Sequence, residues 1–192
     1  EFGLLSDFTP VPWSERPSLL TKEGLVSVKD HAVEGLRGVF SLLTMKWYLS
    51  GWKGADFAVQ AEELYGSMNE AFARGDLKAL STICFPNMYA NLKNDIKKRR
   101  VNFDWRKVTT VSPPRIVQVR CGRLTSEFAV GQVVVRIDQE QAVTPLAKKS
   151  GGAAAAGKNA PRPVHVREYV VFQRVVSDPA SPWCIYGKLN VP

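Results

Sequence analysis

The sequence holds few of the residues from which most metal and acid–base sites are built. It has two histidines, His31 and His165, and three cysteines, Cys84, Cys121 and Cys184. The histidines lie 134 positions apart, neither has a neighbouring cysteine at zinc-site spacing, and no Cys-x-x-Cys or His-Glu-x-x-His pattern occurs. An odd number of widely separated cysteines argues against a disulfide framework and favours a reducing compartment. The sequence therefore predicts no metal site, no cofactor and no disulfide framework.

Long apolar runs and phosphate-binding loops are also missing. The most apolar run, residues 39–45, is far shorter than the roughly 20 residues that cross a bilayer core. Residues 1–3 lack the basic start of a signal peptide. No P-loop, dinucleotide-binding glycine pattern or serine-hydrolase elbow occurs. The sequence predicts neither a membrane-spanning helix nor a nucleotide-binding loop.

Positive charge exceeds negative charge in this chain of 192 residues. Lysine and arginine number 26 against 18 acidic residues, a formal net charge of +8, and 45% of the residues are apolar. Such a size and composition are typical of one globular domain. The basic excess favours an anionic partner, either nucleic acid, an anionic membrane surface or an acidic protein. A basic but inert surface is the alternative interpretation.

Two segments are expected before the main domain. Residues 1–30 contain Pro10, Pro12 and Pro17. These favour an extended tail, because proline fixes its own φ and biases the preceding residue away from helix. Residues 31–55 have the apolar periodicity of an amphipathic helix.

Residues 56–192 are expected to form the main domain, and its helices come first. Asp56 is expected to cap the first helix, Gly75 to end it with a positive φ, and Asp76 to cap the next one. Three helices are therefore expected, over residues 56–75, 77–83 and 87–100.

From residue 101 the pattern changes to β-branched and aromatic residues. Strands are expected at 115–121, 128–137, 165–176 and 183–190, with Pro113 and Pro114 marking a turn. Residues 144–163 are rich in alanine and glycine and are expected to be a flexible insertion. Helices followed by strands predict an α+β fold, with N-terminal helices packed on a curved, mainly antiparallel sheet of three to four strands.

Basic residues gather between residues 93 and 107, where Asp95 and Asp104 are the acids. Several cations together are needed for useful affinity to RNA phosphates, and nearby Phe103 and Trp105 could stack on unpaired bases. In the alternative, both aromatic residues belong to the core and the cations form a solvated helix end. The candidate RNA-binding residues are Lys93, Lys97, Lys98, Arg99, Arg100, Arg106 and Lys107.

The helix expected within residues 31–55 has a wide apolar sector. Its narrow stripe at spacings of three and four consists of Val33, Leu36, Phe40, Leu43 and Trp47. Tryptophan and tyrosine are typical of membrane interfaces, although a helix buried against the domain is the alternative. The candidate membrane-binding residues are Phe40, Trp47, Tyr48 and Trp52.

Catalysis has little support in the sequence. Acid–base catalysis needs a carboxylate or histidine buried where its pKa can move. Glu168 and Asp138 lie in or beside expected strands, but carboxylates there more often pair with a cross-strand arginine. Arg136, Arg167 and Arg174 are available for such pairs. The sequence thus predicts no catalytic residue and no small-molecule substrate.

Five motifs occur in the order typical of one known family. The first is Ala61-Glu-Glu-Leu-Tyr followed by Asn69-Glu-Ala-Phe-Ala-Arg-Gly-Asp-Leu-Lys-Ala-Leu80, and the second is Met88-Tyr89 before a basic helix end. The third is Arg167-Glu-Tyr-Val-Val-Phe-Gln-Arg174, the fourth is Pro182-Trp183, and the fifth is Ile185-Tyr-Gly-Lys-Leu189. Together they resemble the Tim44-like domain family over about residues 56–191.

The resemblance implies a nuclear-transport-factor-two-like α+β cone in a mitochondrial matrix protein bound peripherally to the inner membrane. The family includes the anchor of the protein-import motor, a mitochondrial large-subunit ribosomal protein of the L forty-five type, and a fungal membrane-associated ribosome receptor. The aromatic helix and the last strand are most similar to the two ribosome-associated members. This similarity implies a non-catalytic tether that holds the large subunit, near its polypeptide exit, to the membrane for co-translational insertion. The implied partners are the large subunit and its rRNA, anionic lipid and an insertase.

Two alternatives remain open. An anchor or scaffold of the import motor would bind import subunits instead of ribosomes. A small isomerase or dehydratase on the same fold would need a polar pocket with an acid or a histidine.

Within the expected insertion, Lys148, Lys149 and Lys158 are candidate helpers in RNA binding.

Overall fold

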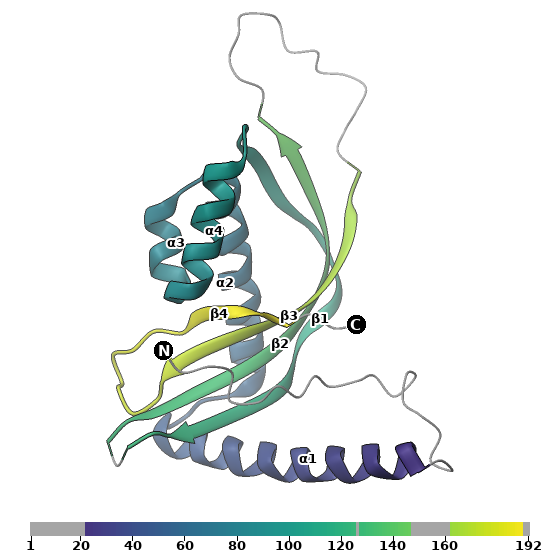
Figure 1. Cartoon of the computed structure of the whole chain (residues 1–192), viewed down its shortest axis with the longest axis vertical. Helices are drawn as coiled ribbons and strands as arrows, with labels where there is room; N and C mark the ends of the chain where they lie inside the picture. The colour runs from purple at the N-terminus through teal and green to yellow at the C-terminus, as the bar shows by residue number, and fades with distance from the viewer. Residues whose placement is uncertain (1–21, 126, 147–161, 190–192) are drawn as a thin grey trace, which may run out of the picture.

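The described part of the chain forms four helices followed by four strands (Figure 1). The computed structural model describes residues 22–125, 127–146 and 162–189, with side chains from residue 35 onward. The helices are α1 (Lys22–Tyr48), α2 (Gly54–Arg74), α3 (Leu77–Ile83) and α4 (Pro86–Lys98). The strands are β1 (Phe103–Arg123), β2 (Ala129–Pro145), β3 (Val164–Val175) and β4 (Cys184–Leu189).

The strands form one antiparallel sheet in the order β1-β2-β3-β4. The sheet curves around α2, with α3 and α4 on the same side, and α1 crosses its lower end in the view of Figure 1. Each strand pairs with the next one along the chain, as antiparallel neighbours in sequence commonly do. The predicted α+β fold, with helices on one face of a curved antiparallel sheet, is confirmed.

Alternation along the strands sorts the side chains onto two faces of the sheet. Val133 and Val135 of β2 are fully buried and belong to the main core together with Phe57 of α2. We call the face that carries them the inner face. Val134 and Val171 form a smaller apolar cluster on the outer face. Because the period of a strand is two, neighbouring residues of β2 serve different environments.

The turn between α2 and α3 follows its sequence signals closely. Gly75 has a φ of 78°, and its N–H donates to the Phe72 carbonyl at 3.0 Å. The N–H of Asp76 donates to the Ala71 carbonyl at 2.9 Å. The Asp76 carboxylate then accepts a hydrogen bond from the N–H of Ala79 at 3.0 Å, which caps α3. Both expectations for this turn are confirmed.

The start of α2 differs from the prediction. Asp56 lies in the first turn, and the N-cap is Lys53, whose carbonyl accepts from the N–H of Phe57 at 3.0 Å. A Cβ at Gly54 would lie 3.2 Å from Ile116 Cδ1, so glycine lets this end of the helix approach β1 closely. Tertiary packing thus begins the helix earlier than the best local capping residue.

The helix α1 also begins earlier than expected, at Lys22, within the predicted tail of residues 1–30. The prolines that favoured a tail end at Pro17, so they do not oppose a helix from residue 22. The rest of the predicted tail, residues 1–21, lies outside the described residues.

The first strand is the largest difference from the prediction. β1 begins at Phe103 and runs through Pro113 and Pro114, which were expected to form a turn. β1 is an edge strand, and the register shifts on both sides of Ser112 leave Pro113 and Pro114 without a partner on β2, so the bulge accommodates their missing N–H groups. β2 runs on to Pro145, and most of the predicted insertion, residues 147–161, lies outside the described residues.

Candidate functional site

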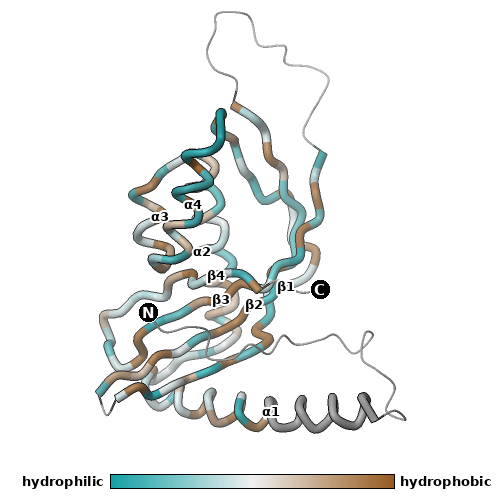
Figure 2. Tube along the Cα trace, in the orientation of Figure 1, coloured by the Kyte–Doolittle hydropathy of each residue, from teal (hydrophilic) through white to brown (hydrophobic). Residues whose placement is uncertain are grey.

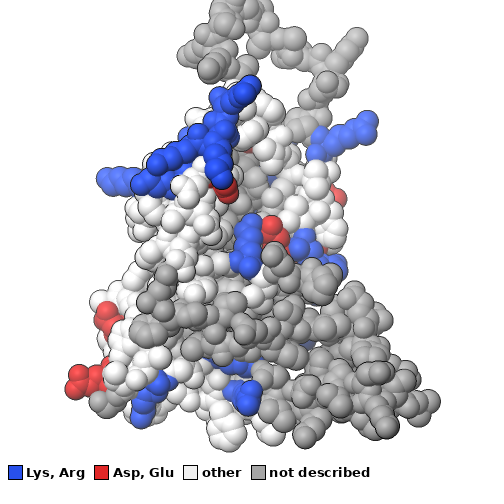
Figure 3. All heavy atoms as spheres, viewed as in Figure 1, with Lys and Arg blue, Asp and Glu red and all other residues white. Residues whose placement is uncertain are grey.

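The exposed basic surface of the domain centres on the end of α4. Lys97 and Lys98 occupy its last turn and Arg100 follows it, and all three are exposed. Figure 3 shows Lys and Arg side chains gathered over α4 and the segment that follows it. Lys93 lies one turn earlier, with its ammonium 5.6 Å from the centroid of the Tyr89 ring. Cations at this end are favoured by the negative end of the helix dipole.

Arg99 stands in the middle of this run but faces inward. One of its terminal nitrogens donates to the Ala73 carbonyl and to Asn102 Oδ1, both at 3.0 Å. Its guanidinium also lies over the rings of Phe72 and Phe103, at 5.1 and 5.8 Å from their centroids. Burial lowers the pKa of Arg99. This residue ties the end of α2 to the segment between α4 and β1, so its side chain is not available to RNA.

The last two predicted cations lie on opposite faces of β1. Lys107 Nζ pairs with Glu62 Oε1 of α2 at 3.3 Å, on the inner face. Trp105 lies on the same face, and its Nε1 donates to Gln141 Oε1 at 2.9 Å. Arg106, between them in sequence, therefore projects from the outer face.

The seven predicted cations thus separate into groups. Lys93, Lys97, Lys98 and Arg100 form one surface, which we call the α4 basic end. Of the aromatic residues predicted as possible stacking platforms, Trp105 is buried in the main core and Phe103 is half-buried against it. The candidate helpers Lys148, Lys149 and Lys158 lie outside the described residues.

The second candidate surface is an apolar stripe on α1. Leu36, Val39, Phe40, Leu43 and Trp47 are between 55% and 73% exposed, and we call them the α1 stripe. Met45 lies on the opposite side of the helix and is fully buried in the main core. Brown segments recur along the described part of α1 in Figure 2. The helix therefore has two apolar faces, of which only one packs on the sheet.

The four predicted membrane-binding residues divide between these two faces. Phe40 and Trp47 belong to the α1 stripe. Tyr48 and Trp52 pack against the main core, where the Trp52 ring lies 5.8 Å from that of Phe57. The two surfaces also lie far apart, because α1 crosses the lower end of the molecule and the basic end of α4 points toward the upper end (Figure 1).

An open cavity of about 400 Å³ lies between α1, α2 and β1. Its lining is mainly apolar, with Lys46 and Arg115 as the charged members. The described residues that line it include no acid and no histidine. Asp138 and Glu168, the carboxylates considered for catalysis, lie elsewhere.

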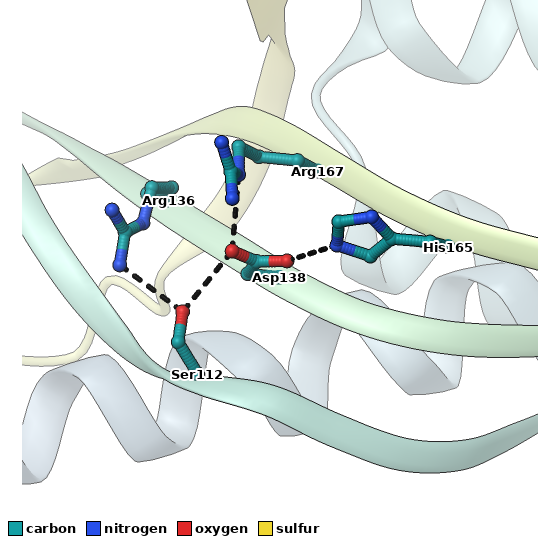
Figure 4. Close-up of polar contacts among 5 residues, drawn as sticks. All are labelled: Ser112, Arg136, Asp138, His165 and Arg167. Atoms are coloured by element: carbon teal, nitrogen blue, oxygen red, sulfur yellow. Dashed lines mark hydrogen bonds and ion pairs between the residues drawn. The ribbon is translucent and has the colours of Figure 1, made fainter. Parts of the chain in front are cut away.

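Asp138 lies at the centre of a polar cluster on the outer face (Figure 4). Its side chain is 2% exposed, and Arg167 Nε and Ser112 Oγ both donate to Oδ2, at 3.0 and 3.1 Å. His165 Nε2 contacts Oδ1, and Arg136 donates to Ser112 Oγ at 3.1 Å. Both carboxylate oxygens are therefore occupied, and the imidazole is 49% exposed on a strand. This geometry fits an ion-pair cluster that holds three strands together, as the pairing alternative predicted.

Burial alone would raise the pKa of the Asp138 carboxyl. Hydrogen bonds from His165, Arg167 and Ser112 and the charge of Arg167 outweigh that effect, so the pKa of Asp138 lies below its usual range. Glu168, the other candidate, pairs with Lys188 Nζ of β4 at 2.6 Å and forms no ion pair with any arginine that the structure describes.

Sequence reasoning missed two further features. Tyr65, almost fully buried, accepts a hydrogen bond from Gln141 Nε2 at 2.9 Å, and burial raises its pKa. A buried tyrosine within an apolar helix stripe gives no sign of this partner. The second feature is the contact between Ser112 and Asp138. The sequence does not predict it, because the pairing register of β1 and β2 shifts on both sides of Ser112.

Among the described residues, no three acidic, cysteine or histidine side chains are placed to hold a metal ion. No described helix is long and apolar enough to span a membrane.

These features define an α+β domain in which helices cover one face of an antiparallel sheet and carry a basic end and a separate apolar stripe. The chain belongs to the Tim44-like domain family, whose domain matches residues 42–189. The family resemblance seen in the motifs is thereby confirmed.

Several curated relatives share the name large ribosomal subunit protein mL45. The chain is 28% identical to the one from Bos taurus over 191 residues and 28% identical to that from Xenopus tropicalis over 188 residues. It is 19% identical to the one from Drosophila melanogaster over 191 residues. These matches cover 97% to 99% of this chain but only 61%, 59% and 51% of the relatives. The chain therefore spans somewhat more than half of their length.

Proposed function

We propose that this chain is part of a mitochondrial ribosome-associated tether. It holds the large subunit, near its polypeptide exit, against the inner membrane during co-translational insertion, with an insertase as the neighbouring partner. The observation that carries the proposal is the separation of two exposed surfaces on one folded domain. The α4 basic end suits a polyanion, the α1 stripe suits an apolar phase, and they lie at opposite ends of the molecule (Figure 1).

The ribosomal contact is assigned to the α4 basic end. Lys97, Lys98 and Arg100 are exposed, and none of their side-chain nitrogens lies within 4.0 Å of a carboxylate oxygen of another described residue. Each cation that neutralises an RNA phosphate releases counterions, so the contact should weaken steeply with salt. The relatives named large ribosomal subunit protein support this choice of partner.

The membrane contact is assigned to the α1 stripe. Phe40 and Trp47 are 69% and 73% exposed, more than apolar side chains of this size usually are in a folded domain. Arg37 and Lys46 flank the stripe on its two sides, where basic residues contribute about 1 kcal/mol each near an anionic leaflet. A helix whose apolar stripe lies in the interface between membrane and water binds the membrane without spanning it.

The two alternatives have less support. An anchor of the import motor is consistent with the family but not with the shared name of the relatives. An enzyme of the isomerase or dehydratase kind would need an acid or histidine in its pocket. The described lining of the cavity beside α1 offers Lys46 and Arg115 instead. We therefore propose a role without catalysis.

Charge reversal tests the ribosomal contact. The variant K97E/K98E should lose co-sedimentation with mitochondrial large subunits at moderate salt. The matched control is K53E/K78E, which changes the net charge equally at two exposed lysines outside α4. If both variants sediment like the wild type, the α4 basic end is not the contact. If the chain instead co-purifies with import subunits and not with ribosomes, the import-anchor alternative is correct.

Flotation with liposomes tests the membrane contact. L43E/W47E should abolish flotation with vesicles that contain cardiolipin, while its unfolding free energy stays within about 0.5 kcal/mol because both side chains are exposed. V143E is the control, since Val143 is 49% exposed on β2 near the other end of the sheet. Unchanged flotation of L43E/W47E would remove the α1 stripe from the proposal.

A further inference from the structure

We propose that the exposed face of α4 docks along the backbone of double-helical RNA and not on unpaired bases. This inference rests on the ribosomal contact proposed above and names the form of RNA that α4 recognises. Three observations on α4 and its neighbours carry it.

The first observation is the composition of the exposed face. At 3.6 residues per turn, Asn87, Asn91, Asn94 and Lys98 fall within about a sixth of a turn around the helix axis. All four are exposed, and none of the three amides forms a hydrogen bond with another described residue. An amide both donates and accepts, so this face presents paired hydrogen-bonding groups that lead into a cationic end.

The second observation is the lack of an available stacking surface beside this face. Trp105 is buried and hydrogen-bonded to Gln141, and Phe103 is half-buried against the main core with the Arg99 guanidinium over its ring. Tyr89 is half-buried, packs against the same core and has the Lys93 ammonium over its ring. The exposed aromatic side chains of the described residues, Phe40 and Trp47, lie on α1. Proteins that bind single strands need exposed aromatic rings on which bases stack, so α4 lacks their main device.

The third observation is the match between this helix and an RNA duplex. A helix of 13 residues is about 20 Å long. The wide, shallow minor groove of A-form RNA displays 2′-hydroxyl groups between two lines of phosphates. Asn91 and Asn94 would meet the 2′-hydroxyls while Lys97, Lys98 and Arg100 contact phosphates at the end of the helix. Because DNA has no 2′-hydroxyl, this arrangement favours an RNA duplex over a DNA duplex of the same sequence.

The experiment measures binding of the full chain to three fluorescent probes by anisotropy. The probes are an RNA duplex of about 20 base pairs, the DNA duplex of the same sequence and a uridine single strand of equal length. The wild type should bind the RNA duplex about tenfold more tightly than either other probe. The variant N91A/N94A should lose about tenfold in affinity for the RNA duplex, and the affinity for DNA should not change.

Two further variants separate the amides from the charges. K97Q/K98Q should lower the slope of log affinity against log salt by about two on every duplex, whereas N91A/N94A should leave that slope unchanged. Q60A/S67A, which removes two exposed polar groups on α2, is the matched control and should bind like the wild type. Alanine favours helix, so N91A/N94A should fold normally, which circular dichroism verifies.

Tighter or equal binding to the single strand overturns the inference, and so does an unchanged RNA-to-DNA preference in N91A/N94A. These outcomes are distinguishable from failure of the proposed function. If K97E/K98E abolishes ribosome co-sedimentation while the single strand is preferred, the ribosomal contact stands and only the duplex form is wrong. If K97E/K98E leaves co-sedimentation intact, the ribosomal contact itself fails.

Discussion

Arg167 of β3 and Asp138 of β2 are direct cross-strand partners, and Arg167 Nε donates to Asp138 Oδ2 at 3.0 Å. The carboxylate is almost fully buried on the outer face, whereas the arginine is 52% exposed. A buried carboxylate is costly unless hydrogen bonds and an opposite charge compensate it. The cluster around Asp138 therefore fixes the register of the sheet at the point where β1 bulges around Ser112.

The first prediction concerns this cluster and pH. The pKa of Asp138 is lower in the folded state than in the unfolded chain. Its contribution to stability is therefore present above the unfolded pKa of about 4 and is lost as pH falls through the lower, folded pKa. Asp138→Asn should cost about 2 kcal/mol near neutral pH, because charge-assisted hydrogen bonds are lost. Urea unfolding from pH 7 to pH 3 should show a smaller decline for the variant than for the wild type.

The matched control for this prediction is Asp178→Asn, since Asp178 is an exposed acid outside the cluster. Its unfolding free energy should follow the wild-type pH profile within about 0.5 kcal/mol. A variant at Asp138 with the wild-type profile would show that the cluster does not contribute to stability.

The second prediction compares two neighbouring arginines. Arg99→Leu should destabilise the fold by about 1–2 kcal/mol, because hydrogen bonds to Ala73 and Asn102 are lost. Arg100→Leu should leave stability within about 0.5 kcal/mol but reduce the salt dependence of RNA binding by about one counterion. Thermal unfolding and anisotropy titrations at several salt concentrations measure the two effects. The opposite pattern would mean that the division of roles within the basic run is wrong.

The third prediction concerns the packing of α1 against β2. A Cβ at Gly131 would lie 2.8 Å from both Met45 Sδ and Val176 Cγ1, and both side chains are buried. Gly131→Ala should therefore cost about 1–3 kcal/mol through overpacking. Gly35→Ala is the control, because nothing lies within 4 Å of its Cβ and alanine favours a helix interior. Denaturant unfolding should show a loss for the first variant and no loss for the second.

The fourth prediction concerns the free thiols. Burial, together with the nearby Cys184, raises the pKa of Cys84 to about 12. The thiolate is the reactive form, so Cys84 should label very slowly at pH 8 in the folded chain. An Ellman assay should count all three thiols only after unfolding in guanidinium. Because the unfolded thiol ionises near pH 8.5, stability from this group should decline above that pH. Rapid labelling of Cys84 in the folded chain would contradict its burial.

Local signals were sufficient where the fold depends on neighbouring residues. The α2–α3 turn was predicted from Gly75 and Asp76, because a positive φ and an N-cap are properties of a few consecutive residues. Pro113 and Pro114 misled the same kind of reasoning, since an edge strand tolerates prolines that a central strand would not. Whether a strand is at an edge depends on sheet order, which no short segment specifies.

The sequence by itself determined the α+β class, the basic run at the end of α4 and the second apolar face of α1, because composition and periodicity depend only on the order of the residues. Only the tertiary structure decided which members of those groups face solvent. Arg99 faces inward and Lys107 pairs with Glu62, whereas Phe40 and Trp47 are exposed. The physical reason is that burial depends on contacts between elements distant in sequence, and a side chain meets its partner only when those elements pack.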